Sequence, residues 1–361
     1  MAKKNNTYTT ALHEKDGVKT QKILSITSAN AIKAKRQKQP SPADLVAQII
    51  KGNITALSRA ITLVESKNIQ HSKKANSIIA ACLPFANHAI RIGITGVPGV
   101  GKSTFIEAFG THLTSLGKKV AVLAVDPSSS LSNGSILGDK TRMEDLVKDQ
   151  NAFIRPSPSG DALGGVARKT RETIILCEAA GFDTIIIETV GVGQSETAVH
   201  SMVDFFLLLK LAGAGDELQG IKRGIIEMAD AIVINKADGE NIKAAKLAKL
   251  EFNRALHLYP SKDSEWSPKV TLCSALKHQG ISEIWEMIKL YKSTTTANTY
   301  FETNRAHQNK FWLLQTIEER LTSNFYNSTK IKAELQAQIK LVEASKTTPF
   351  AAAEYLLGLV N

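Results

Sequence analysis

Short apolar runs alternate with stretches of helical periodicity between about residues 86 and 293. The runs predict strands at 90–95, 119–125, 151–155, 183–188, 203–211, 230–235 and 269–273. Between them, apolar residues recurring every three or four positions predict helices at 102–116, 141–149, 165–180, 220–228, 239–257 and 280–291. Short strands joined by helices indicate an α/β fold, a mostly parallel sheet flanked by helices. In such sheets, ligands gather at the carboxyl ends of the strands.

Helical patterns flank this central part on both sides. We expect a basic, disordered tail at 1–40, a helical extension at 41–86, the central domain at 87–293 and a helical region at 294–361. The last region predicts helices at 298–324, 328–345 and 349–358. The first of these carries Phe301, Phe311, Trp312, Leu314 and Leu321. That is more apolar surface than an isolated helical hairpin can cover, so we expect a subunit interface or packing against the core, and we favour a homodimer.

Charge and cysteine usage narrow the function classes. The chain has 361 residues and a net charge of +11, but residues 1–40 hold nine Lys or Arg against Glu14 and Asp16. The basicity therefore belongs to the tail, and we expect no nucleic-acid partner. No apolar run is long enough for a membrane span. Three cysteines without metal-ligand spacing, Cys82, Cys177 and Cys273, predict small core residues in a reducing compartment, the cytoplasm.

A phosphate-binding loop stands at the end of the strand predicted at 90–95. Gly96, Gly101, Lys102 and Ser103 fit the pattern G-x-x-x-x-G-K-[ST], in which backbone N–H groups and a helix N-terminus surround the phosphates of a nucleotide. Lys102 is expected to reach the β- and γ-phosphates, and the Ser103 hydroxyl to bind Mg²⁺. The nucleotide contacts of the loop are then Gly96, Gly99, Val100, Gly101, Lys102, Ser103 and Thr104.

A second motif identifies the base. Asn235-Lys236-Ala237-Asp238 follows the apolar strand 230–235, and N-K-x-D at a strand end is the guanine-reading motif of P-loop GTPases. The Asp238 carboxylate can accept from both N1–H and the 2-amino group of guanine, whereas adenine leaves it unpaired. Asn235 holds the loop, and the stem of Lys236 covers the base. After the last strand, the turn Ser274-Ala275-Leu276 matches the S-A-[LK] turn that meets the guanine O6.

A third set of residues surrounds the terminal phosphate. Glu188 ends a β-rich run, where it can hold Mg²⁺ through water, and the N–H of Gly191 can meet the γ-phosphate. The position that holds the water-positioning Gln in Ras-like enzymes is Val192, which cannot orient water. Hydrolysis is therefore expected to be slow without Gln194, a mobile lysine or a group from a partner.

Two further loops predict nucleotide-dependent switches. A polar loop with Asp126 at its start and Asp139 near its end is typical of a segment that orders around Mg²⁺ and the γ-phosphate. A solvated loop with Asp139 as a helix cap is the alternative. In the stretch 212–224, Lys222 or Arg223 can neutralise charge during phosphoryl transfer. A plain helix start with solvated basic residues is an equally good interpretation there.

Several longer strings occur here in one order: V-D-P-S-S, G-S-I-L-G-D-K-T-R-M, L-G-G-V-A-R-K-T-R-E, E-T-V-G-V-G-Q-S-E, G-D-E-L-Q-G-I-K-R-G and N-K-A-D. Over about 40–345 the chain resembles the methylmalonyl-CoA mutase-associated GTPases, the MeaB/ArgK-type chaperones of metal enzymes. The resemblance implies a dimeric GTPase that loads adenosylcobalamin into the mutase, an acyl-CoA mutase, and protects it. It places magnesium and switch carboxylates on Asp126, Asp139 and Glu188, and a lysine that assists hydrolysis on Lys222.

Some positions depart from the family pattern, and other functions stay open. Ala212 replaces a common Pro before the third loop, and Ser159-Gly160-Asp161-Ala162 stands where S-S-G-T is usual. These departures affect expected partner contacts rather than nucleotide binding. The alternatives are a P-loop kinase or ATPase linked to basic amino-acid transport, a GTPase chaperone of another metalloenzyme, and a nucleic-acid or membrane module that uses the basic tail.

Overall fold

The computed structural model describes residues 40–125, 143–156, 163–189, 195–213 and 223–359. The chain divides into two units, Met1–Ser41 and Pro42–Asn361, and the second contains the whole sheet. The predicted disordered tail, 1–40, falls outside the described residues apart from its last residue.

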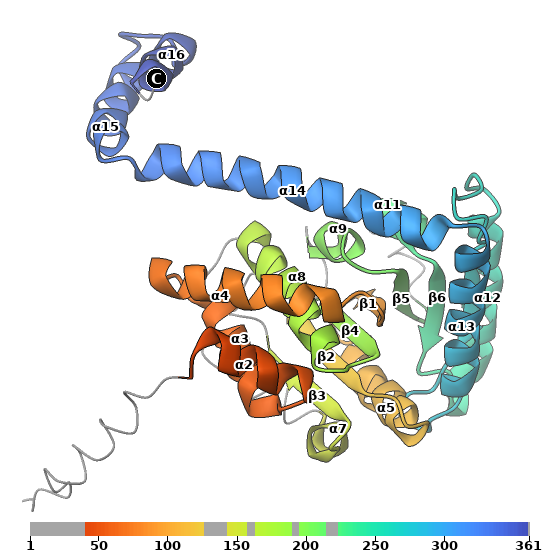
Figure 1. Cartoon of the computed structure of the whole chain (residues 1–361). Coiled ribbons are helices and arrows are strands. Elements are labelled where there is room, and N and C mark those ends of the chain that lie inside the picture. Colours follow the sequence, from red (N-terminus) through yellow and green to blue (C-terminus); the bar gives the residue numbers. More distant parts are fainter. Residues whose placement is uncertain (1–39, 126–142, 157–162, 190–194, 214–222, 360–361) are drawn as a thin grey trace, which may run out of the picture. The chain divides into compact units, whose positions relative to one another are not determined.

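Within the described residues, parallel strands form one seven-stranded sheet in the order β3-β2-β4-β1-β5-β6-β7 (Figure 1). The strands are β1 (Ile90–Gly96), β2 (Val120–Val125), β3 (Ala152–Arg155), β4 (Thr184–Thr189), β5 (Phe205–Leu211), β6 (Ala231–Asn235) and β7 (Lys269–Leu272). The predicted α/β class is confirmed. Nearly continuous apolar sequence fits these strands because helices cover both faces of a parallel sheet.

The two faces of the sheet carry different helices. The connecting helices are α5 (Lys102–Ser115), α7 (Glu144–Lys148), α8 (Leu163–Ala179), α9 (Ser195–His200), α11 (Arg223–Met228), α12 (Ile242–Leu256) and α13 (Ile281–Ala297). Side chains of α5 and α13 pack with Ile92, Ile94 and Ile186 on one face. Those of α8, α9 and α12 pack with Ile185 and Ile187 on the other. Alternate residues of each strand therefore face different layers.

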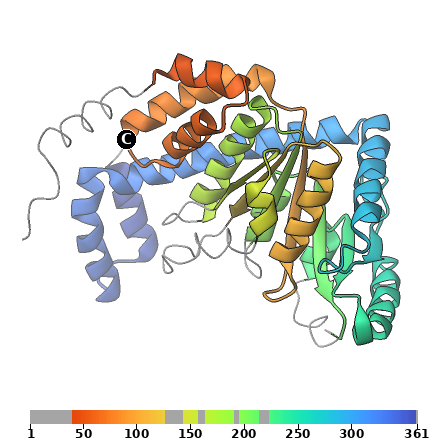
Figure 2. The ribbon, with the colours of Figure 1, turned by 90° about the horizontal axis from the view of Figure 1, so that it is seen from below.

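An amino-terminal group of helices extends the second layer. It comprises α2 (Pro42–Ile50), α3 (Ile54–Glu65), α4 (Ile69–Cys82) and the 3₁₀ turn η1 (Leu83–Phe85). All three α-helices contact α8, and Figure 2 shows these red to orange helices beside the yellow-green α8. Their buried residues Leu57 and Ile61 belong to the same apolar cluster as the sheet residue Ile185. The helical pattern predicted from Ser41 to about Phe85 is thus confirmed.

Most helix boundaries differ from the predictions by one to three residues, and the start of α12 and the end of α13 have identifiable causes. Helix α12 begins at Ile242, after the 3₁₀ turn η2 (Gly239–Asn241), rather than at 239. Helix α13 continues to Ala297 instead of ending at 291. The run of Ser and Thr does not end it, because the Thr295 hydroxyl donates to the Tyr291 carbonyl one turn earlier (2.8 Å) and the side chain is fully buried.

Helices α14 (Tyr300–Asn327), α15 (Thr329–Glu343) and α16 (Pro349–Gly358) follow. Buried polar side chains hold the first part of α14 to the sheet. The Arg305 guanidinium donates to both carboxylate oxygens of Asp204 (2.7 Å each), and Gln308 donates to the Val203 carbonyl (2.7 Å). The Trp312 indole N–H donates to the Ser201 carbonyl (3.0 Å). Three residues of the segment before β5, Ser201, Val203 and Asp204, thereby hold α14 in place.

Candidate functional site

The phosphate loop has the backbone that the sequence predicted. Gly101 adopts φ +93° immediately before α5, and a Cβ atom there would lie 2.9 Å from Asn235 Nδ2. A Cβ atom on Gly96 would lie 2.6 Å from the Leu209 carbonyl oxygen. Only glycine fits these two positions without displacing a neighbour. The loop therefore joins β1 to the N-terminus of α5, the arrangement that suits an anion.

Lys102 is almost fully buried at the start of α5. Its Nζ donates to the carbonyl oxygens of Gly96 (2.8 Å) and Val97 (3.4 Å). Burial lowers the pKa of Lys102, while the negative charges of Glu188 and Glu196 oppose this shift. A desolvated ammonium held by neutral carbonyls can exchange them for phosphate oxygens at little cost in reorganisation.

The side chains suited to Mg²⁺ come from neighbouring elements. Ser103 occupies the first turn of α5, and Glu188 lies on β4 directly opposite Ile94 of β1. Glu188 is 7 % exposed. A hydroxyl and a carboxylate are the hard oxygen donors that Mg²⁺ accepts alongside water and phosphate. No group of three or more His, Cys, Asp or Glu forms a metal site in the described part of the chain. A site shared with the nucleotide fits these donors better than an all-protein cage.

The first two residues of the N-K-x-D motif are bonded to the phosphate loop. Asn235, at the end of β6, donates from Nδ2 to the Val100 carbonyl (2.9 Å) and accepts from the Ala275 N–H (3.2 Å). Lys236 donates from Nζ to the Gly99 carbonyl (2.9 Å). Asn235 is 1 % exposed. These bonds join three loops that lie far apart in the sequence, so base and phosphate groups are positioned together.

Asp238 is held by the turn that follows β7. Its Oδ2 accepts from the Ser274 hydroxyl, and the Ala237 N–H donates to the Cys273 carbonyl (2.9 Å). Ser274 is buried, whereas Leu276 is 77 % exposed. A carboxylate fixed through one oxygen is oriented to receive a pair of N–H donors from a base edge. The structure thus brings together the predicted residues Asn235, Asp238 and Ser274.

Other predicted residues are not placed. Asp126, Asp139, Gly191, Gln194 and Lys222 lie outside the described residues. Their assigned roles stay predictions. Strand β2 precedes Asp126 in the chain, and β4 precedes Gly191. Both strands run parallel to β1 and end at the same edge of the sheet as the phosphate loop.

Similarity to known proteins identifies the group to which this site belongs. Residues 57–330 match the family described as methylmalonyl Co-A mutase-associated GTPase MeaB. The chain belongs to this family. The resemblance inferred from the motifs is therefore confirmed, and the phosphate loop and N-K-A-D motif described above lie inside the matched segment of the MeaB family.

Individual relatives agree with the MeaB assignment. The chain is 48 % identical over 284 residues to a protein of Escherichia coli named GTPase ArgK, covering 79 % of this chain and 86 % of that one. It is 44 % identical over 319 residues to the Mus musculus protein named methylmalonic aciduria type A homolog, mitochondrial, covering 86 % and 77 %. A crystal structure titled LAO/AO transport system kinase superposes with a TM-score of 0.71 at 38 % identity, covering 88 % and 97 %.

One buried charge near the MeaB phosphate loop escaped the sequence prediction. Glu196, in the second position of α9, is 1 % exposed and acts electrostatically on Lys102. It ends the string E-T-V-G-V-G-Q-S-E that helped to identify the family. Its place in that string was the one hint in the sequence that Glu196 matters for the site. The hint was ambiguous, because a glutamate near the start of a helix is also common on an exposed first turn.

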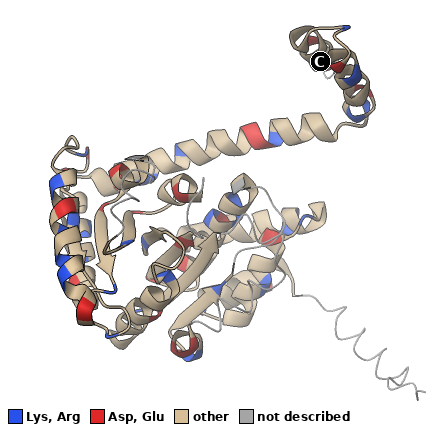
Figure 3. Ribbon diagram, turned by 180° about the vertical axis from the view of Figure 1, so that it is seen from behind, with Lys and Arg blue, Asp and Glu red and all other residues tan. Residues whose placement is uncertain are grey.

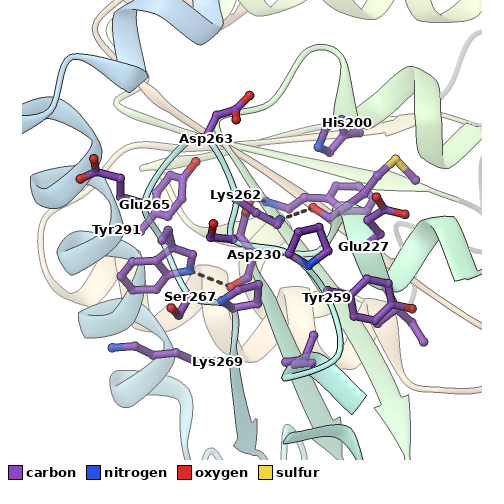
Figure 4. A pocket seen from close by; sticks show the side chains of 18 of the residues that line it. His200, Glu227, Asp230, Tyr259, Lys262, Asp263, Glu265, Ser267, Lys269 and Tyr291 are labelled. Atoms are coloured by element: carbon purple, nitrogen blue, oxygen red, sulfur yellow. Dashed lines mark hydrogen bonds and ion pairs between the residues drawn. The ribbon is translucent and has the colours of Figure 1, made fainter. Parts of the chain in front are cut away.

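A large cavity lies at the opposite edge of the sheet (Figure 4). It has a volume of about 1090 Å³ and is bordered by residues at the amino ends of β6 and β7, among them Asp230 and Lys269. Lys262 binds the Asp230 carboxylate (2.8 Å) and the carbonyls of Met228 and Ala229 at the end of α11. Since the nucleotide motifs lie at the carboxyl ends, this cavity is separate from the candidate site.

The length of the helices decides whether one could span a membrane, and the burial of the cysteines decides how reactive they are. Across the described residues, no helix has the length and apolarity needed to cross a bilayer. Cys82, Cys177 and Cys273 are free and buried, as the sequence predicted. Burial raises the pKa of Cys82 to about 11 and that of Cys273 to about 12, so neither thiol is a ready nucleophile.

Proposed function

We propose that this protein is a GTP-hydrolysing chaperone of an adenosylcobalamin-dependent acyl-CoA mutase of the methylmalonyl-CoA mutase type. One observation carries the nucleotide part of the proposal: Asn235 and Lys236 are bonded to the phosphate loop at Val100 and Gly99. The mutase part rests on the family name and on the relatives described above. The protein would gate cofactor loading and protect the mutase through its nucleotide state.

Each part of a bound GTP would have its own group of residues, and only Asp126 and Asp139 among them lie outside the described part of the chain. The loop around Gly101 would surround the phosphates, Lys102 would neutralise the β- and γ-phosphates, and Asp238 would read guanine. Ser103 and Glu188, with Asp126 and Asp139, would hold Mg²⁺, which supplies charge neutralisation at the transferring phosphoryl group. Lys102 already has its ammonium positioned by carbonyls of the same loop.

The group that positions the attacking water is assigned as a hypothesis to Gln194 or Lys222. Val192 occupies the slot of the Ras-like glutamine and has no polar atom to orient water. Intrinsic hydrolysis is therefore expected to be slow, and docking of the mutase is expected to accelerate it. Measuring GTP turnover with and without added mutase tests this, and an unchanged rate would contradict the partner assignment.

We also propose a homodimer in the cytoplasm. The far part of α14 and the helices after it expose large apolar side chains: Leu313, Leu314, Ile317, Leu321, Phe350 and Leu357. Apolar surface of this extent favours a partner face. Three free, buried cysteines support a reducing compartment.

Base selectivity gives the sharpest test of the nucleotide assignment. In Asp238→Asn an amide can donate where the carboxylate accepted, so preference should move from GTP to XTP by about 100-fold or more. Calorimetric titration with both nucleotides measures this. Glu240→Gln, an exposed neutralisation in the adjacent turn, should retain guanine preference. Unaltered GTP selectivity in Asp238→Asn would remove this residue from base reading.

A second assay separates this function from that of a kinase. The similar structure titled LAO/AO transport system kinase motivates a test for phosphoryl transfer to basic amino acids or to a protein acceptor. The proposed GTPase should release phosphate to water alone. Labelled γ-phosphate recovered on an acceptor would favour the kinase instead.

A further inference from the structure

Two threonines form a buried hydrogen bond between neighbouring strand ends. Thr95 is the penultimate residue of β1 and Thr189 the last residue of β4. The register pairs Ile94 with Glu188, so the next residues along each strand are also opposite each other. The Thr189 hydroxyl donates to the Thr95 hydroxyl oxygen over 2.8 Å. Both side chains are buried, with exposures of 0 % and 1 % respectively.

Apolar packing at these two positions does not require hydroxyl groups. The preceding residues on the same face of β4 are Ile185 and Ile187, which are fully buried in the apolar layer beneath α8 and α9. Valine has nearly the shape of threonine and would fill the same space without a polar group. Burying a hydroxyl is unfavourable unless it is paired, and the two threonines pair with each other.

The bond connects two backbone segments that carry phosphate-side groups. Thr95 immediately precedes Gly96, whose carbonyl accepts from Lys102 Nζ. Thr189 immediately follows Glu188, the carboxylate assigned to Mg²⁺. Alternation places Glu188 on the face of α5 and both threonines on the opposite face. The hydroxyls therefore face away from the phosphate side and are not expected to contact phosphate. They join the two strand ends that carry Glu188 and the Gly96 carbonyl to which Lys102 is bonded.

We propose that Thr95 and Thr189 are positioning residues for GTP hydrolysis. Their hydrogen bond fixes the end of β4 against the phosphate loop, so that Glu188 and Lys102 keep one separation while charge moves during phosphoryl transfer. Small displacements of catalytic groups reduce rates far more than they weaken ground-state binding. This inference rests on the proposed GTPase function and names two residues to which the sequence motifs assigned no role.

The test uses Thr95→Val, Thr189→Val and the double variant. Each single variant should lower kcat about tenfold, with KM for GTP and Kd for GDP changed less than about twofold. Each should also lower the melting temperature, because one buried hydroxyl loses its partner. In the double variant no hydroxyl is orphaned, so the melting temperature should recover while kcat stays about tenfold low. Thr189→Ser, which keeps a hydroxyl, should restore the rate.

This separation of stability from rate distinguishes positioning from a structural role. If the double variant recovers both melting temperature and kcat, the bond is merely structural and the proposal is overturned. Thr184→Val is the matched control, since Thr184 is buried at the other end of β4 and its hydroxyl also makes a hydrogen bond (2.9 Å, to Asp183). An equal loss of kcat in this control would likewise overturn the proposal.

A readout without turnover keeps the inference separate from the GTPase assignment. The affinity of the GDP complex for Mg²⁺, measured by titrating Mg²⁺ into the chain bound to a fluorescent GDP analogue, should weaken about threefold in the double variant and remain unchanged in Thr184→Val. A wild-type chain that binds Mg-GDP yet hydrolyses no GTP even with mutase added would refute the proposed function, while this magnesium effect would still support the positioning of Glu188 by the threonine pair. Equal magnesium affinity in wild type and double variant would refute the pair alone.

Discussion

The two halves of α14 differ in which side chains they bury: the first half buries polar residues, and the second half exposes large apolar ones. In the first half Arg305, Gln308 and Trp312 are each 6 % exposed and are bonded to residues 201–204. In the second half Leu313 is 62 % and Leu321 65 % exposed. Figure 3 shows charged residues at several points along the helix, and in the second half Glu318, Glu319 and Arg320 stand between Ile317 and Leu321 in the sequence. The first half of this helix thus docks on the sheet through hydrogen bonds and an ion pair. The second half leaves apolar side chains exposed.

The polar half is held by directed contacts, because the guanidinium, amide and indole donors of Arg305, Gln308 and Trp312 each reach an acceptor, although the buried Gln308 Oε1 has no partner among the described residues. Besides Asp204, the Arg305 guanidinium donates to the carbonyl oxygens of Asn87 (2.8 Å) and Ala89 (2.6 Å). Burial acts to lower the pKa of Arg305, but hydrogen bonding and charge from Asp204 outweigh it, so the pKa is raised. A guanidinium fork can satisfy a carboxylate and two carbonyls at once, which lysine cannot do.

Removing the buried guanidinium should have the largest effect. Arg305→Met leaves the Asp204 carboxylate buried without its charge partner, so the free energy of unfolding should fall by about 3–5 kcal/mol. Urea denaturation followed by circular dichroism measures this. Arg320→Met, on the exposed surface of the same helix, should cost less than about 0.5 kcal/mol. Equal stability of the two variants would show that the inner half is not an anchor.

Charging the outer half should act on association instead. Leu313, Ile317 and Leu321 recur four residues apart and form one stripe. The double change Leu313→Asp with Leu321→Asp should weaken self-association by about 2–4 kcal/mol and leave unfolding nearly unchanged. Sedimentation equilibrium measures the dimer constant. Leu83→Asp with Leu116→Asp, at similarly exposed sites elsewhere, serves as the control. Undiminished association in the first pair would exclude this stripe from the dimer interface.

The junction between the halves should be the least sensitive. Trp312→Phe keeps most of the buried ring but removes the hydrogen bond to the Ser201 carbonyl, at a cost of about 1 kcal/mol. Thermal unfolding of this variant is compared with that of Phe311→Leu, a half-exposed neighbour that should stay close to wild type. If Trp312→Phe lowered the free energy of unfolding more than Arg305→Met does, the Trp312 contact would be the stronger anchor and this ranking would be wrong.

The sequence was most informative where local geometry dictates residue type. The turn before α5 requires glycine at 101, and the contacts of Asn235 and Asp238 follow from a motif whose chemistry is fixed by guanine. The strands were found because their apolar runs are short and bounded. The continuation of α13 through Thr295 was missed, since side-chain bonding to the helix backbone depends on burial by other elements.

Long-range polar packing was the part that pattern reasoning missed. Arg305 looks like one more charged residue of an exposed helix, and only its contact with Asp204, immediately before β5, shows that it is buried. The Thr95–Thr189 pair was hidden for the same reason, because each threonine alone is an ordinary strand residue. The cavity beside Asp230 likewise forms from segments that are unrelated in sequence.

The distance along the chain between Arg305 and Asp204 has a consequence for biosynthesis. Asp204 leaves the ribosome 101 residues before its guanidinium partner. A nascent chain can assemble the strands of the sheet and still carry an uncompensated carboxylate at the start of β5. The carboxylate gains its charge partner only when α14 docks, so a polypeptide truncated before that helix should be destabilised and more readily degraded.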